Sequence, residues 1–138
     1  MNLEKLVAIS GRPGLFKMVS NRSNGLLIED FDKSQRFFVS ARLHQFTPLA
    51  SISIYTDNEE ETVLLAEVFK RMNENFETTP PIDVKSDSTQ LRKYFETIMP
   101  EHDRDKVLVS DIKKLIKWFD FLKTRNLLSF EEETEIKE

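Results

Sequence analysis

The chain has no cysteine among its 138 residues, and this absence removes several classes of chemistry. Disulfides, thiolate zinc sites, iron–sulfur clusters and cysteine nucleophiles all need a thiol, so none of them is open to this protein. Long apolar runs are also missing, since no stretch approaches the roughly 18 residues that cross a bilayer. The first residues carry no basic segment followed by an apolar run, as a secretory signal would. We therefore expect a cytoplasmic protein that does not contact membranes.

A strong excess of either charge is lacking as well. The chain holds 24 acidic and 20 basic side chains, which gives a net charge of −4 at pH 7. Residues 1–58 carry 7 basic and 5 acidic side chains, whereas residues 59–138 carry 13 basic and 19 acidic ones. A mildly acidic chain is a poor default candidate for electrostatic binding of nucleic acid. Its length allows one domain, or two very small ones packed together.

Glycine is scarce, with three residues that all lie in the first half of the chain. That half alternates apolar and polar residues with a period of two and is rich in β-branched and aromatic side chains, which predicts strands. Gly11–Gly14 and Asn24-Gly25 mark turns, because glycine and asparagine tolerate positive φ. Residues 41–48 form a longer link with room for one helical turn. We expect strands at residues 4–10, 14–20, 25–30, 36–40 and 50–55.

The hydrophobic period changes to 3.6 after residue 57, which predicts helices. Asp57 or Asn58 caps the first, and three glutamates in its first turn suit the positive end of the helix dipole. We expect helices near residues 59–74, 88–99 and 110–124, a proline-containing linker at 76–87 and an acidic tail. In the third helix, Trp118 widens the apolar stripe beyond what one neighbouring helix covers, and we expect its side chain to be largely buried.

These patterns predict an α+β protein. Residues 1–57 would form a small SH3-like β-barrel of about five strands, with Ile54 pointing inward from the last strand. Residues 58–138 would form a helical domain of about three helices. An OB-type barrel fits less well, because it usually needs more residues.

Three stretches support this fold by resemblance. They are Leu6–Lys17 (LVAISGRPGLFK), Arg36–Arg42 (RFFVSAR) and Val109–Trp118 (VSDIKKLIKW). Together they resemble an uncharacterised bacterial family that has an N-terminal SH3-like domain of unknown function followed by a small helical domain. The resemblance spans roughly residues 5–122. It implies the fold and no activity, so no functional residue is carried over from it.

Motifs for catalysis or cofactor binding are weak. Gly11–Gly14 lacks the Gly-Lys-Ser/Thr ending and the following helix of a phosphate-binding loop, so a plain turn is favoured. Glu101–Asp105 begins like a calcium loop, but Leu108 and Lys114 stand where that loop needs glycine and glutamate. His44 and His102 have no partner histidine at ligand spacing. We expect no enzyme, no metal and no cofactor, and we expect a surface or loop role for both histidines.

The remaining candidates are surface residues that would contact a partner. The interaction surface that we predict comprises Arg12, Lys17, Arg36, Arg42, Tyr55 and Trp118. The function that we favour is protein–protein interaction or self-association, with an unknown protein or a second copy as partner. The alternative is nucleic-acid binding by the basic face of the barrel, with Phe16, Phe37 and Tyr55 stacking on bases.

Overall fold

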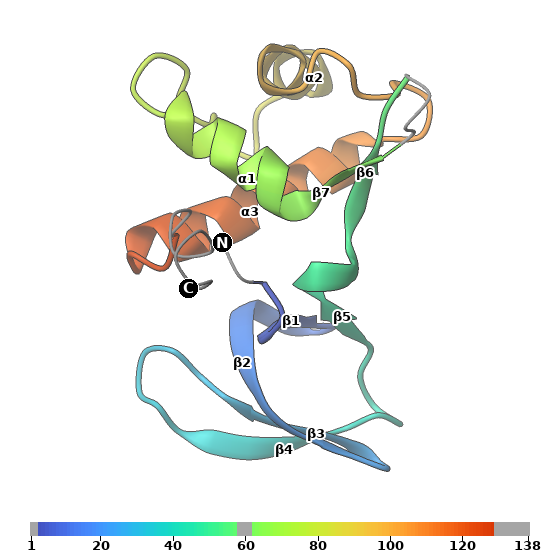
Figure 1. Cartoon of the computed structure of the whole chain (residues 1–138), viewed down its shortest axis with the longest axis vertical. Coiled ribbons are helices and arrows are strands. Elements are labelled where there is room, and N and C mark those ends of the chain that lie inside the picture. The colour runs from blue at the N-terminus through green and yellow to red at the C-terminus, as the bar shows by residue number, and fades with distance from the viewer. Residues whose placement is uncertain (1–2, 58–61, 129–138) are drawn as a thin grey trace, which may run out of the picture. The chain divides into compact units, whose positions relative to one another are not determined.

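The computed structural model describes residues 3–57 and 62–128 and divides the chain into two compact units (Figure 1). Of the described residues, 3–52 form the sheet unit, and 53–57 and 62–128 form the helical unit. The expected α+β class is therefore confirmed. Among the described residues, no helix is both long and apolar enough to cross a membrane.

The sheet unit is built on five antiparallel strands in the order β4-β3-β2-β1-β5, so that β4 and β5 are its edges. The strands are β1 (Leu6–Ile9), β2 (Arg12–Arg22), β3 (Gly25–Glu29), β4 (Arg36–Ser40) and β5 (Phe46–Pro48), and a short 3-10 turn (Leu49–Ser51) follows β5. Alternate residues of the strands point to one face and bury a common core. This core consists of Val7, Ile9, Phe16, Leu26, Ile28 and Val39.

Irregularities in β1 and β2 bend this sheet. The register of the β1–β2 pair shifts between Val7 and Ile9, and that of the β2–β3 pair shifts between Met18 and Ser20. An extra residue on one strand kinks it and increases the local twist. The long β2 strand can thereby pair with β1 at one end and with β3 at the other.

Two of the predicted turns exist, and the glycine of one of them differs from the expectation. Gly11 has a φ of 81° in the tight connection after Ile9, as the turn requires. Gly25 is instead the first residue of β3, and its φ is not in the left-handed region. A Cβ atom on Gly25 would lie 2.1 Å from the carbonyl oxygen of Val39. Close approach of two strands, rather than positive φ, therefore requires this glycine.

The helical unit contains β6 (Ser53–Tyr55), β7 (Thr62–Leu64), α1 (Leu65–Glu74), α2 (Ser88–Ile98) and α3 (Val109–Thr124). Each helix buries one stripe with the predicted period of 3.6. The buried stripes are Leu65, Val68, Phe69 and Met72 in α1, Leu91, Tyr94, Phe95 and Ile98 in α2, and Ile112, Leu115, Ile116, Phe119 and Leu122 in α3. No helix or strand lies between Asn75 and Asp87, where the linker was expected.

Several boundaries differ from the prediction. The strand expected at 50–55 is not part of the five-stranded sheet, because β6 pairs with β7 in the helical unit. Ile54 is buried, but it lies opposite Val63 in that second sheet. The first helix starts at Leu65 rather than near 59, because residues 62–64 pair as a strand. Its expected acidic first turn, Glu59–Glu61, lies outside the described residues, as does the acidic tail.

Other differences concern the link and the helix caps. The link at 41–48 contains β5, because its last residues pair with β1, Phe46 lying opposite Ile9. Asp87 caps α2, and its Oδ1 atom accepts a hydrogen bond of 2.9 Å from the backbone N–H of Gln90. At the start of α3, Asp111 accepts a hydrogen bond of 2.9 Å from the backbone N–H of Leu108. These side chains satisfy N–H groups that have no partner within the helix.

Candidate functional site

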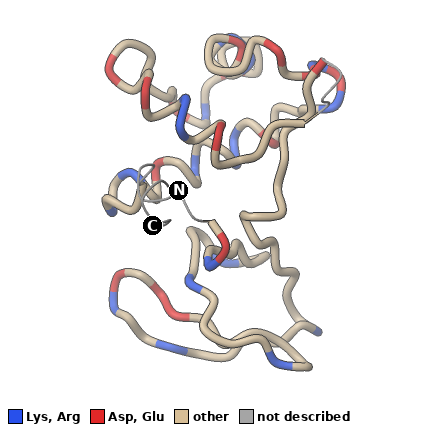
Figure 2. Tube along the Cα trace, in the orientation of Figure 1, with Lys and Arg blue, Asp and Glu red and all other residues tan. Residues whose placement is uncertain are grey.

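The four predicted basic residues lie in the sheet unit, and an acidic residue, Glu29, lies between two of them. The strand register aligns Lys17, Glu29 and Arg36 in one row across β2, β3 and β4. Arg36 pairs with Glu29, since its Nε atom lies 2.9 Å from Oε1. Figure 2 shows the Lys and Arg residues of this unit on separated segments of the trace rather than in one stripe. The row therefore carries less positive charge than its cations alone would give it.

Arg12 and Arg42 have different surroundings. The guanidinium of Arg12 lies 5.0 Å from the centre of the Phe37 ring, within the range of a cation–π interaction. Phe37 in turn contacts Phe16 edge to face at 6.1 Å. Arg42 lies in the turn after β4, where its backbone N–H donates to Ser40 Oγ at 3.1 Å. Both of these arginines are exposed.

Of the three aromatic residues expected to stack on bases, Tyr55 is exposed and the other two pack against the core of the sheet unit. Phe16 is buried, Phe37 is half-buried and packs against the same core, and Tyr55 belongs to the helical unit. The exposed aromatic residue of the sheet is Phe38, which is 44% exposed in the middle of β4. Side chains alternate along a strand, so Phe37 and Phe38 lie on opposite faces of the sheet. The sequence pattern alone does not say which of these faces is buried. Leu43 is also strongly exposed and was not predicted.

The ring of Phe38 covers the gap left by Gly25 on the neighbouring strand. A Cβ atom at Gly25 would lie 2.7 Å from Cζ of Phe38. The register places Phe38 directly opposite Leu27, which is half-buried. Phe38 and Leu27 therefore form a small apolar patch beside the Glu29–Arg36 pair at one edge of the sheet.

Tyr55 and Trp118 belong to the helical unit, so the six predicted residues do not form one surface within either unit. Tyr55 is exposed, and the Nζ atom of Lys106 lies 5.1 Å from the centre of its ring. Most of the surface of Trp118 is covered, as expected, although the residue is not fully buried. Its position beside the stripe explains the remaining exposure, because Leu115, Ile116 and Phe119 supply the buried face of α3.

Both histidines make short contacts to backbone carbonyl groups. His44 Nδ1 lies 2.9 Å from the carbonyl oxygen of Ser10. His102 Nδ1 lies 2.6 Å from that of Met99, and its ring contacts Phe95 edge to face. Of the expected surface or loop role, His102 has the loop position, between α2 and α3, but its side chain is buried.

The acidic loop before α3 organises its own backbone. Asp103 Oδ1 accepts hydrogen bonds from the backbone N–H groups of Asp105 and Lys106, at 2.9 and 3.1 Å. Local bonds of this kind are typical of an Asx turn. Within the described residues, no three histidine or acidic side chains gather closely enough to hold a metal ion.

Two family models match the chain, and their limits follow the two units. Residues 3–49 match a domain of unknown function, DUF5606, and residues 52–122 match a second domain of unknown function, DUF6852. The second match spans just over half of the chain. The chain belongs to the DUF6852 family. The expected pairing of a domain of unknown function with a helical one is thus confirmed at the level of the families.

The DUF6852 chain is also similar to a solved structure. This is a solution NMR structure of a protein from Bacteroides vulgatus, with 32% sequence identity and a TM-score of 0.76. The similarity covers 94% of this chain and 91% of the other. Among curated proteins none matches the DUF6852 chain. The comparisons therefore establish a family and a fold relative.

Proposed function

We propose that this protein is a non-enzymatic interaction module that self-associates by pairing its β4 strand with the β4 strand of a second copy. The observation that supports the proposal is an exposed phenylalanine, Phe38, at the centre of an edge strand. An edge strand presents unpaired backbone groups, and these are a template for pairing with another chain.

The hydrogen-bond pattern identifies which backbone groups of β4 face outward. Ala41 N–H donates to Asn24 at 2.9 Å, and Asp30 N–H donates to Gln35 at 3.0 Å. In an antiparallel pair, hydrogen-bonded and non-hydrogen-bonded positions alternate. Ala41 and Gln35 are therefore hydrogen-bonded positions, and so are the residues two and four places from them, Val39 and Phe37. The N–H and C=O groups of Phe38, which lies between these two, point away from β3.

The same alternation favours one register for two copies of β4. Antiparallel pairing centred on Phe38 places the two Phe38 residues opposite each other. It also places Arg36 of each copy opposite Ser40 of the other. No like charges then face each other, and the two aromatic rings lie on the same face as a cross-strand pair, an arrangement that stabilises sheets.

The sequence of β4 offers little protection against such pairing. Natural edge strands are commonly blocked by lysine, by proline or by inward-pointing charges. Residues 36–40 contain no lysine or proline, and their single charged residue, Arg36, lies at the end of the strand and pairs with Glu29. Because five residues bury little surface, we expect a weak, concentration-dependent dimer.

The test is sedimentation of the full chain over a wide concentration range. Phe38→Lys places a charge at the centre of the proposed interface and should keep the chain monomeric at concentrations where the wild type dimerises. Leu43→Lys is the matched control, because it also replaces an exposed apolar residue with lysine, but at a site outside the strand. This variant should leave the dimer intact. A wild type that stays monomeric throughout, or a Phe38→Lys variant that dimerises like the wild type, would contradict the proposal.

Nucleic-acid binding through the sheet unit is the alternative. It is supported by the cations Arg12, Lys17 and Arg42 and opposed by the Glu29 carboxylate among them. Retention of the full chain on heparin that falls steeply with salt would favour this alternative.

We also propose that the protein is cytoplasmic and that its sheet unit has an SH3-like form. The strand order and the two register shifts support the SH3-like form.

A further inference from the structure

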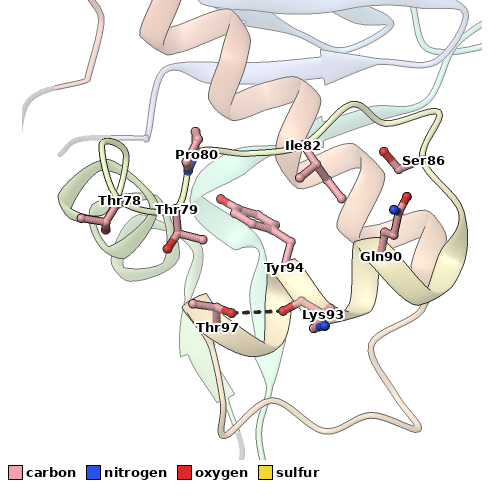
Figure 3. A pocket seen from close by; sticks show the side chains of 9 residues that line it. All are labelled: Thr78, Thr79, Pro80, Ile82, Ser86, Gln90, Lys93, Tyr94 and Thr97. Atoms are coloured by element: carbon pink, nitrogen blue, oxygen red, sulfur yellow. Dashed lines mark hydrogen bonds between the residues drawn. The ribbon is translucent and has the colours of Figure 1, made fainter.

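A pocket of about 500 Å³ lies in the helical unit between the segment 78–86 and α2 (Figure 3). Its volume is within the range of pockets that bind small ligands, roughly 300–1,000 Å³. The pocket is separate from β4, so an inference about it does not depend on the proposed self-association.

The walls and the floor of this pocket are mainly apolar. Pro80 and Ile82 come from the linker segment, and the ring of Tyr94 comes from α2. Figure 3 shows the Tyr94 side chain lying between the linker segment and α2, with its hydroxyl end toward Thr79 and Pro80. These groups suit the hydrocarbon part of a ligand, because burying apolar surface is the main favourable contribution to binding.

The Tyr94 hydroxyl itself carries no negative charge. Burial, together with the nearby Asp120 carboxylate, raises the pKa of this hydroxyl, so the phenol stays neutral at physiological pH. The Tyr94 oxygen is buried and has no hydrogen-bond partner among the residues that the structure describes. Asp120 does not line the pocket, so among the lining side chains there is no negative charge that repels an anion.

Lys93 provides the one charged side chain among the residues that line the pocket. It forms no ion pair with any of the described residues. Of the acids near it in sequence, Asp83 accepts a hydrogen bond from Lys85 N–H at 2.8 Å, Asp87 caps α2, and Glu96 pairs with Arg104. Lys93 is therefore the charged group of the lining that can pair with an anion.

We infer that the pocket binds a monocarboxylate with an apolar body, whose carboxylate pairs with Lys93 while its hydrocarbon part lies against Pro80, Ile82 and Tyr94. Gln90 is one helical turn before Lys93 and also lines the pocket. Its side-chain amide offers an N–H group for the second carboxylate oxygen. A free fatty acid and the C-terminus of a peptide that ends in an apolar residue share this chemistry.

The experiment is a titration of the full chain with octanoate, followed through the amide NMR signals. We expect saturable shifts confined to residues 78–97, and octanamide, which lacks the charge, should bind about tenfold more weakly, the loss typical of one charge-assisted hydrogen bond. Lys93→Gln removes the charge and keeps a polar side chain and a good helix former, so the variant should fold. It should weaken octanoate binding by about tenfold and remove the preference over octanamide. Lys85→Gln is the matched control and should bind like the wild type.

Three results would overturn the inference. They are octanoate shifts that do not saturate, equal binding of octanamide and octanoate, and equal losses in the Lys85→Gln and Lys93→Gln variants. A second arm uses an acetylated tripeptide that ends in leucine with a free carboxylate, beside its amidated form. Tighter binding of the free peptide than of octanoate would support the same site with a protein C-terminus as the source. Lys93 and β4 belong to different units, so the two proposals are tested separately. The chain can bind octanoate even if it does not dimerise.

Discussion

The sheet unit and the helical unit both expose large apolar side chains, but they differ in their buried polar atoms. Phe38 and Leu43 are exposed in the sheet unit, and Tyr55, Leu64 and Leu108 are exposed in the helical unit. The buried side-chain atoms without a hydrogen-bond partner in the described residues all belong to the helical unit. These atoms are Arg92 Nη1, Tyr94 Oη and His102 Nε2.

The difference follows from how each kind of structure satisfies its backbone. A helix pairs its own interior N–H and C=O groups. Three helices can therefore pack around aromatic side chains while a few buried side-chain atoms are left without a hydrogen-bond partner. A sheet satisfies its backbone only where a neighbouring strand exists, so its outermost strand always keeps free groups. We therefore look for protein partners at the sheet edge and for small ligands near the helices.

The largest expected effect tests the aromatic core of the helical unit. Phe119 is fully buried, and its ring centre lies 6.1 Å from that of Phe69 and 6.2 Å from that of Phe76. Phe119→Ala should lower the free energy of unfolding by about 3–5 kcal/mol, because it leaves a cavity that the helices cannot fill. Chemical denaturation followed by the fluorescence of Trp118, the single tryptophan, measures this loss.

The control for that variant is Phe38→Ala, followed by far-UV circular dichroism. Phe38 is partly exposed already, so its truncation should lower the free energy of unfolding by only about 1 kcal/mol. Similar losses for the two phenylalanines would contradict the contrast between a buried aromatic core and an exposed sheet edge.

A smaller effect is expected at the close contact of β3 and β4. Gly25→Ala should destabilise the sheet unit by about 1–3 kcal/mol, because the new methyl group overlaps Val39 and Phe38 and forces the strands apart. Amide hydrogen exchange in β2, β3 and β4 reports the change. Ser23→Ala, in the exposed turn just before, should change stability by no more than about 0.5 kcal/mol. Unchanged exchange in the Gly25→Ala variant would mean that the strands are not so close.

The smallest effect has the opposite sign. Tyr94→Phe removes a buried hydroxyl that has no partner in the described residues, so stability should stay constant or rise by up to about 1 kcal/mol. Tyr55→Phe, at an exposed position, is the control and should have almost no effect. A loss well above 1 kcal/mol for Tyr94→Phe would show that the hydroxyl has a hydrogen-bond partner after all.

The periodic elements were predictable because their signal is local. The apolar stripes of α1, α2 and α3 follow from residues three and four apart, and each helix buries one such stripe. The first two hairpins and β4 were likewise predictable from alternation and turn residues. Composition alone also excluded thiol chemistry in all its forms.

The candidate site was predicted less well. Charge and residue type selected Arg12, Lys17, Arg36 and Arg42, but they contain no information about the Glu29 carboxylate that pairs with Arg36. The pocket near Lys93 had no sequence signal, because it depends on how the proline-containing segment folds back over α2.

The sequence by itself determined that strands come first and helices follow, which helix faces are apolar and which chemistries are excluded. Only the tertiary structure decided that β6 pairs with β7, that Phe38 rather than Phe37 faces outward and that His102 is buried. The physical reason is that strand partners and buried faces depend on residues distant in sequence, whereas helical periodicity is set within a few turns. A segment of alternating apolar and polar residues can pair with different strands and can bury either of its faces. The rest of the chain decides both by packing against it.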